Sequence, residues 1–92
     1  MEDRLWETLR VFQNQPFRTA KGLEFSYEIR GGEMFFSRKV KSITRATVMV
    51  AFRRALEVQE AEGRVAGPKK LGTFGASYLY PVLIRLGVIA SD

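Results

Sequence analysis

The segment over residues 23–40 constrains the fold more than any other part of the chain, because it predicts a β-hairpin. Residues 23–30 alternate between apolar and polar side chains, which is the period of a half-buried strand. Gly31-Gly32 follows, and a glycine pair is typical of the type I′ turn, in which both central residues have positive φ. Residues 33 to about 40 are then expected to form the second strand.

The two-residue turn implies a register that the side chains can test. Apolar residues face apolar ones and opposite charges face each other, and each such pair contributes about 0.2–1 kcal/mol. Phe35 is the exception, because it falls on the polar face beside Glu28. We expect a third strand, a helix or a partner molecule to cover it. The expected pairs are Arg30 with Glu33, Ile29 with Met34, Tyr27 with Phe36, Leu23 with Val40 and Glu24 with Lys39.

Helices are expected on both sides of the hairpin. Residues 2–14 carry apolar side chains at helical spacing and predict an amphipathic N-terminal helix. Residues 43–62 predict a long central helix with a broad apolar stripe. Ser42 or Thr44 can cap its start, and Gly63 suits the position just after its end.

A glycine-rich basic loop over residues 63–76 leads to a predicted C-terminal helix over residues 77–86. Ser77 is the candidate cap, and Pro81 would then fall in the first turn, where its missing N–H costs little. The predicted class is α+β: an N-terminal helix, an antiparallel hairpin with or without a short third strand, a long central helix, the loop and a C-terminal helix. We expect the core to contain Leu5, Leu9, Phe12, Leu23, Phe25, Tyr27, Ile29, Phe36, Val48, Phe52, Leu56, Leu79 and Leu83.

The composition limits the chemistry. The 92 residues, 46% of them hydrophobic, predict a single globular domain over residues 1–92. Cys and His are both absent, which removes the usual ligands of zinc, iron–sulfur and haem sites and the common nucleophile pairs. We therefore expect no cofactor, no metal and no enzymatic activity. The lack of cysteine, of a signal-peptide pattern and of a long apolar run favours a cytoplasmic protein that does not enter a membrane.

The charge distribution supplies the functional hypothesis. Fifteen Lys and Arg against ten Asp and Glu give a net charge of +5, which favours polyanionic partners. Residues 34–56 include no acidic residue, and Arg38, Lys39, Lys41 and Arg45 surround the start of the predicted central helix. A helix start prefers negative charge by about 0.3–1 kcal/mol per residue, so these cations oppose the helix dipole.

A bound anion would explain the reversed charges. Free N–H groups at a helix start bind phosphate, and hydroxyl groups can donate to phosphate oxygens. We predict a nucleic-acid-binding site made of Arg38, Lys39, Lys41, Ser42, Thr44 and Arg45, with Lys69 and Lys70 of the loop at its edge. Two alternatives stay open. The basic residues are solvated or paired with acidic residues of the same chain, or the chain is a protein-interaction domain that forms a homodimer through Phe35.

The run from Ser42 to Val48 resembles the opening of a recognition helix in helix-turn-helix DNA-binding proteins, where small polar and basic residues face the groove and a Val packs inward. The resemblance implies that the first turn of the central helix contacts DNA. It covers seven residues. The chain departs from the motif because a hairpin precedes this helix, where the motif has another helix and a tight turn.

Overall fold

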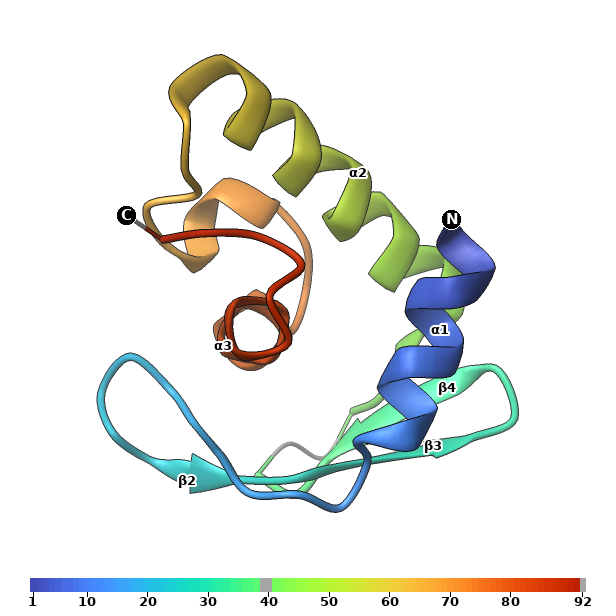
Figure 1. Ribbon diagram of the computed structural model, residues 1–92. Helices are drawn as coiled ribbons and strands as arrows, with labels where there is room; N and C mark the ends of the chain where they lie inside the picture. Colours follow the sequence, from blue (N-terminus) through green and yellow to red (C-terminus); the bar gives the residue numbers. More distant parts are fainter. Residues whose placement is uncertain (39–40, 92) are drawn as a thin grey trace.

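The order of elements along the chain confirms the predicted α+β class. The computed structural model describes residues 1–38 and 41–91. Figure 1 shows the strands along one side of the molecule, with the three α-helices packed over them. In chain order the elements are α1 (Glu2–Val11), β1 (Phe17–Arg18), β2 (Glu24–Phe25), β3 (Tyr27–Arg30), β4 (Glu33–Phe36), β5 (Ile43–Thr44), α2 (Arg45–Glu62), the 3₁₀-helix η1 (Pro68–Leu71) and α3 (Ala76–Arg85).

The strands form two small antiparallel sheets. One has the order β3-β4-β5 and the other pairs β1 with β2, so β5 is the short third strand. The predicted hairpin register is confirmed, since Arg30 pairs with Glu33, Ile29 with Met34 and Tyr27 with Phe36. The other two predicted pairs involve Lys39 and Val40, which lie outside the described residues.

The first predicted strand is broken at Ser26, between β2 and β3. At the break the Ser26 N–H donates to the Ser37 hydroxyl (3.0 Å), and β2 pairs with β1. Leu23 lies just before β2 and is 47% exposed, so its predicted place in the core is wrong. The predicted type I′ turn is also wrong, because only Gly31 of the two turn glycines has a positive φ (61°).

The segment after α1 covers the outer edge of β3. The Asn14 N–H donates to the Tyr27 carbonyl oxygen (2.7 Å), and the Gln13 side-chain oxygen accepts from the Ile29 N–H (2.9 Å). These bonds satisfy polar groups that an edge strand otherwise exposes. The helix therefore ends at Val11, and Phe12 is 42% exposed instead of lying in the core as predicted.

The ends of α2 follow the prediction closely. Thr44, one of the two predicted caps, precedes the helix, and its hydroxyl accepts from the Thr47 N–H (3.2 Å). The chain leaves the helix at Gly63 with a φ of 81°, a left-handed conformation that glycine adopts without strain.

The start of α3 differs from the prediction. The helix begins at Ala76, directly after Gly75, and no side chain caps it, so Ser77 is not the cap. Pro81 consequently lies inside the helix and not in its first turn. A proline at an interior position removes one helical hydrogen bond.

A single cluster of buried side chains joins the sheets to the helices. Apart from Phe12 and Leu23, every predicted core residue is buried or, in the case of Leu56, packs against the cluster. Tyr27 is 1% exposed, its hydroxyl donates to the Leu9 carbonyl oxygen (2.6 Å), and burial raises its pKa well above the usual value. Among the described residues, no helix combines the length and the apolar character needed to cross a bilayer.

Candidate nucleic-acid interface

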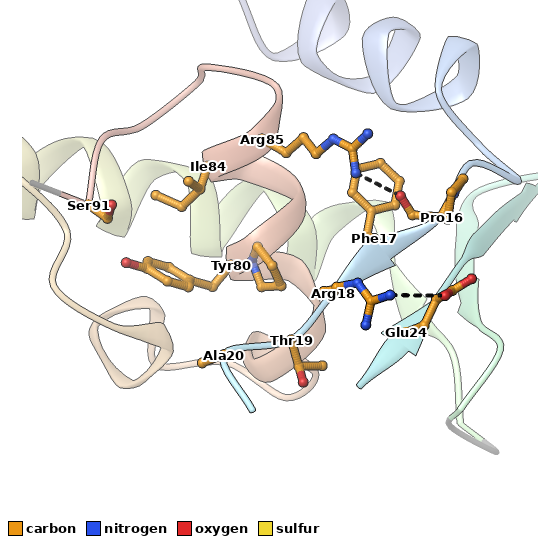
Figure 2. Close-up of a pocket in the computed structure, with 11 residues that line it drawn as sticks. Pro16, Phe17, Arg18, Thr19, Ala20, Glu24, Tyr80, Ile84, Arg85 and Ser91 are labelled. Carbon is orange, nitrogen blue, oxygen red and sulfur yellow. Dashed lines mark hydrogen bonds and ion pairs between the residues drawn. The ribbon is translucent and has the colours of Figure 1, made fainter. Parts of the chain in front are cut away.

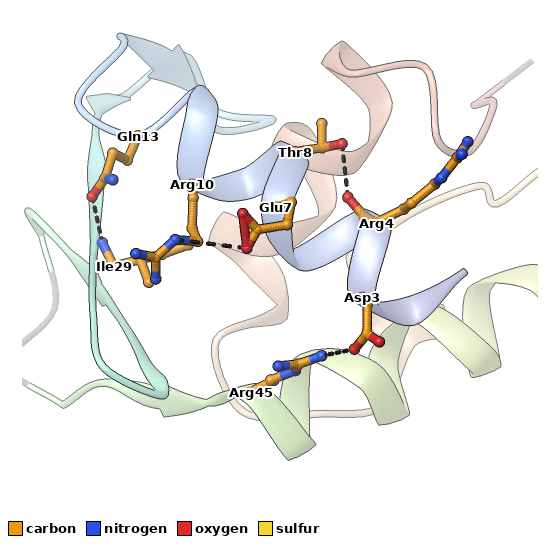
Figure 3. A network of polar contacts seen from close by, with 8 residues as sticks. All are labelled: Asp3, Arg4, Glu7, Thr8, Arg10, Gln13, Ile29 and Arg45. Atoms are coloured by element: carbon orange, nitrogen blue, oxygen red, sulfur yellow. Dashed lines mark hydrogen bonds and ion pairs between the residues drawn. The ribbon is translucent and has the colours of Figure 1, made fainter.

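The first helix lies against the amino-terminal end of α2, where the predicted site is centred (Figure 1). Arg45, the first residue of α2, forms an ion pair with Asp3 of α1 (Figure 3), and its guanidinium carbon lies 5.7 Å from the centre of the Trp6 ring. Arg53 forms an ion pair with Glu2 (2.7 Å). The hydrogen bond from Arg53 lowers the pKa of the Glu2 carboxyl.

These contacts offset part of the reversed charge pattern of α2. The first turn of α2 contains no acidic residue, but Glu2 and Asp3 belong to the first turn of α1 and contact the arginines of α2. Asp3 places a carboxylate beside the first residue of α2, where a helix prefers negative charge, whereas Glu2 pairs with Arg53 in the middle of the helix. Of the cations that pointed to a bound phosphate at this helix end, Arg45 is therefore compensated within the chain.

The predicted basic segment does not gather at the helix start, because β4 separates its ends. The Arg45 N–H donates to the Gly32 carbonyl oxygen (2.8 Å), which is at the turn end of the hairpin. Arg38 lies beyond the other end of β4, and its Nε donates to the Glu24 carbonyl oxygen (2.5 Å). Extended chain rises about 3.3 Å per residue, so the four residues of β4, about 13 Å of strand, separate the position of Arg38 from that of Arg45.

Both hydroxyls predicted to contact phosphate have partners within the chain. The Ser42 hydroxyl donates to the Glu33 carboxylate (2.5 Å). The Thr44 hydroxyl caps α2 and lies 3.1 Å from the Thr47 hydroxyl. Lys39 belongs to the residues that the structure does not describe.

The glycine-rich loop brings its lysines to the side of α2. Lys69 and Lys70 lie on η1, which contacts both α2 and α3 and is anchored by the fully buried Leu71. Lys70 forms an ion pair with Glu62 (3.6 Å). Lys69 is exposed.

Two glycines then allow the loop to run along α2 at close range. A Cβ on Gly72 would lie 3.3 Å from Nη1 of Arg54, and a Cβ on Gly75 would lie 3.1 Å from Cγ2 of Ile43. Both glycines have positive φ. Residues 72–75 therefore follow α2 from Arg54 back to β5.

Residues 34–56 and residues 63–91 both lack Asp and Glu. These two acid-free stretches lie side by side where residues 72–75 run along α2. On α2, Thr47, Val50 and Arg54 share one side, because steps of three and four residues return to the same side of a helix. We call the surface built from this side of α2, from Lys41, which lies two residues before β5, and from the adjoining loop the basic face. It is made of Lys41, Thr47, Val50, Arg54, Lys69 and Lys70.

Three of the four cations of the basic face differ from those at the start of α2, the exception being Lys70, which pairs with Glu62. Within the described parts of the chain, no carboxylate forms an ion pair with Lys41, Arg54 or Lys69, whereas Arg45 and Arg53 each have one. The predicted site did not include Arg54. The second acid-free stretch, over residues 63–91, was the signal that could have found this face.

Phe35 lies where the register placed it, opposite Glu28. It is half-buried, and the guanidinium carbon of Arg30 lies 4.0 Å from the centre of its ring. An arginine stacked on an aromatic face is a favourable cation–π contact. The ring, for which a third strand, a helix or a partner was the expected cover, is thus covered in part by an arginine of its own hairpin.

The start of α2 shares one feature with the recognition helix that it resembles. Val48 is fully buried, as the resemblance implies. The preceding element is β5, so the helix and tight turn of the helix-turn-helix motif do not stand before α2.

Within the described ranges, no group of three or more Asp, Glu, Cys or His side chains is placed to hold a metal ion. Comparison of the chain with protein-family models, with curated proteins and with solved structures finds no match.

Proposed function

We propose that the protein binds nucleic acid through phosphate contacts on the basic face. The observation that carries the proposal is the alignment of two acid-free stretches of chain, which run so close together that a Cβ on Gly72 would lie 3.3 Å from Arg54 and a Cβ on Gly75 would lie 3.1 Å from Ile43. Neither stretch contributes a carboxylate to this surface. The acidic residues nearest to it come from elsewhere: Glu33 accepts from Ser42 beside β5, Glu62 pairs with Lys70 of η1, and Glu57 is exposed one turn after Arg54.

The unpaired cations give this face its affinity for phosphate. An exposed arginine or lysine that has no carboxylate partner needs to break no ion pair when a phosphate approaches, and it releases counterions from the nucleic acid when it binds. Arg54 offers a planar fork that suits bidentate phosphate contacts, while Lys69 and Lys41 act as point charges. Arg45 and Arg53 contribute only if they give up Asp3 and Glu2.

The side of α2 between these cations suits close approach. Thr47 and Val50 have short side chains, and Val50 is 45% exposed. A hydroxyl and a small apolar group between basic residues permit contact with a sugar–phosphate backbone without a large steric barrier. Contacts of this kind position a nucleic acid and carry no base preference, so we expect binding that depends weakly on sequence.

A salt series with a matched control tests the proposal. Fluorescence anisotropy would measure binding of labelled duplex DNA, single-stranded DNA and RNA to the unmodified chain, to an Arg54→Gln/Lys69→Gln variant and to an Arg4→Gln/Lys21→Gln variant. Arg4 lies on α1 and Lys21 lies between β1 and β2, so the control removes the same charge from other surfaces. A thermal melt of each variant confirms that it is folded.

The expected result distinguishes binding at the basic face from a general effect of the protein's net charge. On duplex DNA the slope of log K against log salt should fall by about 0.9 for each phosphate contact removed, hence by about 2 for the basic-face variant. The control should keep the original slope and most of the affinity. Equal losses in both variants would contradict the assignment to this face, and the absence of binding to all three nucleic acids at about 50 mM salt would refute the function itself.

The homodimer alternative has less support. Arg30 covers part of Phe35, and Gln13 and Asn14 occupy the outer edge of β3, which leaves that edge with fewer free groups for a second strand. We therefore give nucleic-acid binding precedence. Light scattering of the unmodified chain and of Phe35→Glu distinguishes the two, since a dimer that becomes a monomer on substitution would restore the alternative.

A further inference from the structure

A pocket lies between β1 and α3, outside the basic face. Figure 2 shows a pocket of about 510 Å³, a size within the range of about 300–1,000 Å³ that small-molecule sites occupy. Residues 16–20 form one wall and α3 forms the other. The two walls belong to distant parts of the chain, since Arg85 and Pro16, which share a hydrogen bond, are 69 positions apart.

The walls of the pocket are mostly apolar. Phe17 is 2% exposed and Tyr80 is 9% exposed, so their rings present only an edge or part of a face to it. The Tyr80 hydroxyl donates to the Val65 carbonyl oxygen (2.6 Å), which directs it away from ligands and leaves the ring as an apolar surface. Ile84 and Pro81 of α3 complete this side.

Two guanidinium groups stand at the pocket, and both are fixed by backbone carbonyls. Nη1 of Arg85 donates to the Pro16 carbonyl oxygen (2.9 Å), and its guanidinium carbon lies 5.3 Å from the centre of the Phe17 ring. Nη1 of Arg18 donates to the Gly22 carbonyl oxygen (3.0 Å). Each guanidinium has five N–H donors, so these bonds orient the groups and leave further donors for a ligand.

The charge at the pocket is not balanced by the residues that line it. Glu24 is the one carboxylate among the lining residues, and it lies 3.6 Å from Nη2 of Arg18. No ion pair is found for Arg85 in the described part of the chain. The lining therefore carries one excess positive charge beside an apolar wall.

We propose that this pocket binds a small organic anion, an aromatic or branched aliphatic carboxylate, with its carboxylate on Arg85 and its apolar body against Phe17 and Ile84. A carboxylate matches the planar fork of a guanidinium in two parallel hydrogen bonds. The apolar body gains by leaving water at the same time. This inference does not depend on nucleic-acid binding.

The experiment uses three probes of one shape and different charge: 4-phenylbutyrate, 4-phenylbutanol and 4-phenylbutylamine. Each is titrated into the isotopically labelled full chain, and amide shifts in a ¹H–¹⁵N correlation spectrum give the site and the affinity. We expect phenylbutyrate to shift the amides of Phe17, Thr19 and Ile84 and to bind at least tenfold more tightly than the alcohol, with the amine weaker still.

Two variants locate the anion contact. Arg85→Gln should weaken phenylbutyrate binding about tenfold or more and leave the alcohol unchanged, whereas Arg4→Gln on α1 should change neither. If Arg85→Gln unfolds, the comparison of the three probes on the unmodified chain still tests whether the pocket prefers an anion. Equal affinity of the three probes, or shifts confined to amides outside the pocket at about 10 mM ligand, would overturn the proposal.

Discussion

Replacing Gly75 with alanine tests the contact that holds the glycine-rich loop against β5. Gly75 has a φ of 79°, and an added Cβ would lie 3.1 Å from Cγ2 of Ile43 and 3.5 Å from Cε2 of Phe36. Carbon atoms prefer separations of about 3.5–4.0 Å. Ile43 and Phe36 are both 3% exposed, so neither has open space into which to move.

The expected loss of stability has two parts. A left-handed conformation costs an alanine about 1–2 kcal/mol, and forcing an extra methyl group into a packed core costs about 1–3 kcal/mol more. Gly31→Ala is the matched control, because Gly31 has a φ of 61° and nothing lies within 4 Å of its added Cβ. Gly31→Ala should therefore lose only the cost of the left-handed conformation, about 1–2 kcal/mol.

Urea denaturation of the unmodified chain and of the two variants measures the difference in the free energy of unfolding. We expect Gly75→Ala to be less stable than Gly31→Ala by about 1–3 kcal/mol, or by about 4–8 °C in Tm for each kcal/mol in a domain of this size. If the two variants lose equal stability within about 0.5 kcal/mol, the loop does not press on Ile43, and the reasoning that joins the two acid-free stretches fails.

Two further predictions follow from the hydrogen bonds of the core and of α2. Thr44→Ala removes the cap of α2 and should lower the free energy of unfolding by about 1 kcal/mol, whereas Ser42→Ala, which leaves the cap in place, should cost less in the same urea denaturation. Folding raises the pKa of Tyr27, so its protonated form stabilises the fold fully below about pH 10, and that contribution is lost as the pH rises toward the folded-state pKa. In pH-dependent denaturation the unmodified chain should therefore lose up to about 1.4 kcal/mol per pH unit more than Tyr27→Phe above about pH 10; parallel curves would contradict this.

Local pattern predicted the regular elements well, because their causes lie within a few residues of sequence. The alternation from Phe25 to Ile29 and the glycine pair after Arg30 gave the hairpin and its register. Thr44 and Gly63 marked the ends of α2. These features depend on side-chain periodicity and on backbone conformation, which a single sequence records directly.

Errors arose where a contact across the fold competed with local pattern. Phe12 continues the apolar spacing of α1, but the chain turns after Val11 so that Gln13 and Asn14 can bond to β3. Leu23 continues the alternation of the hairpin, but the strand breaks at Ser26 and its first part pairs with β1. In both cases hydrogen bonds to a neighbouring strand, β3 for the segment after α1 and β1 for β2, take the place of the burial of one apolar side chain.

The sequence by itself determined the α+β class, the hairpin register, the limits of α2 and the excess of basic over acidic residues, because each is a property of neighbouring positions or of composition. Only the tertiary structure decided which cations are compensated. Asp3 and Arg45 are 42 positions apart and Glu2 and Arg53 are 51 apart, yet they pair. Coulombic interaction depends on distance in space and not on distance along the chain. The packing of α1 on α2 therefore pairs Arg45 and Arg53 with carboxylates. The packing of the loop beside Arg54 places the two acid-free stretches next to each other.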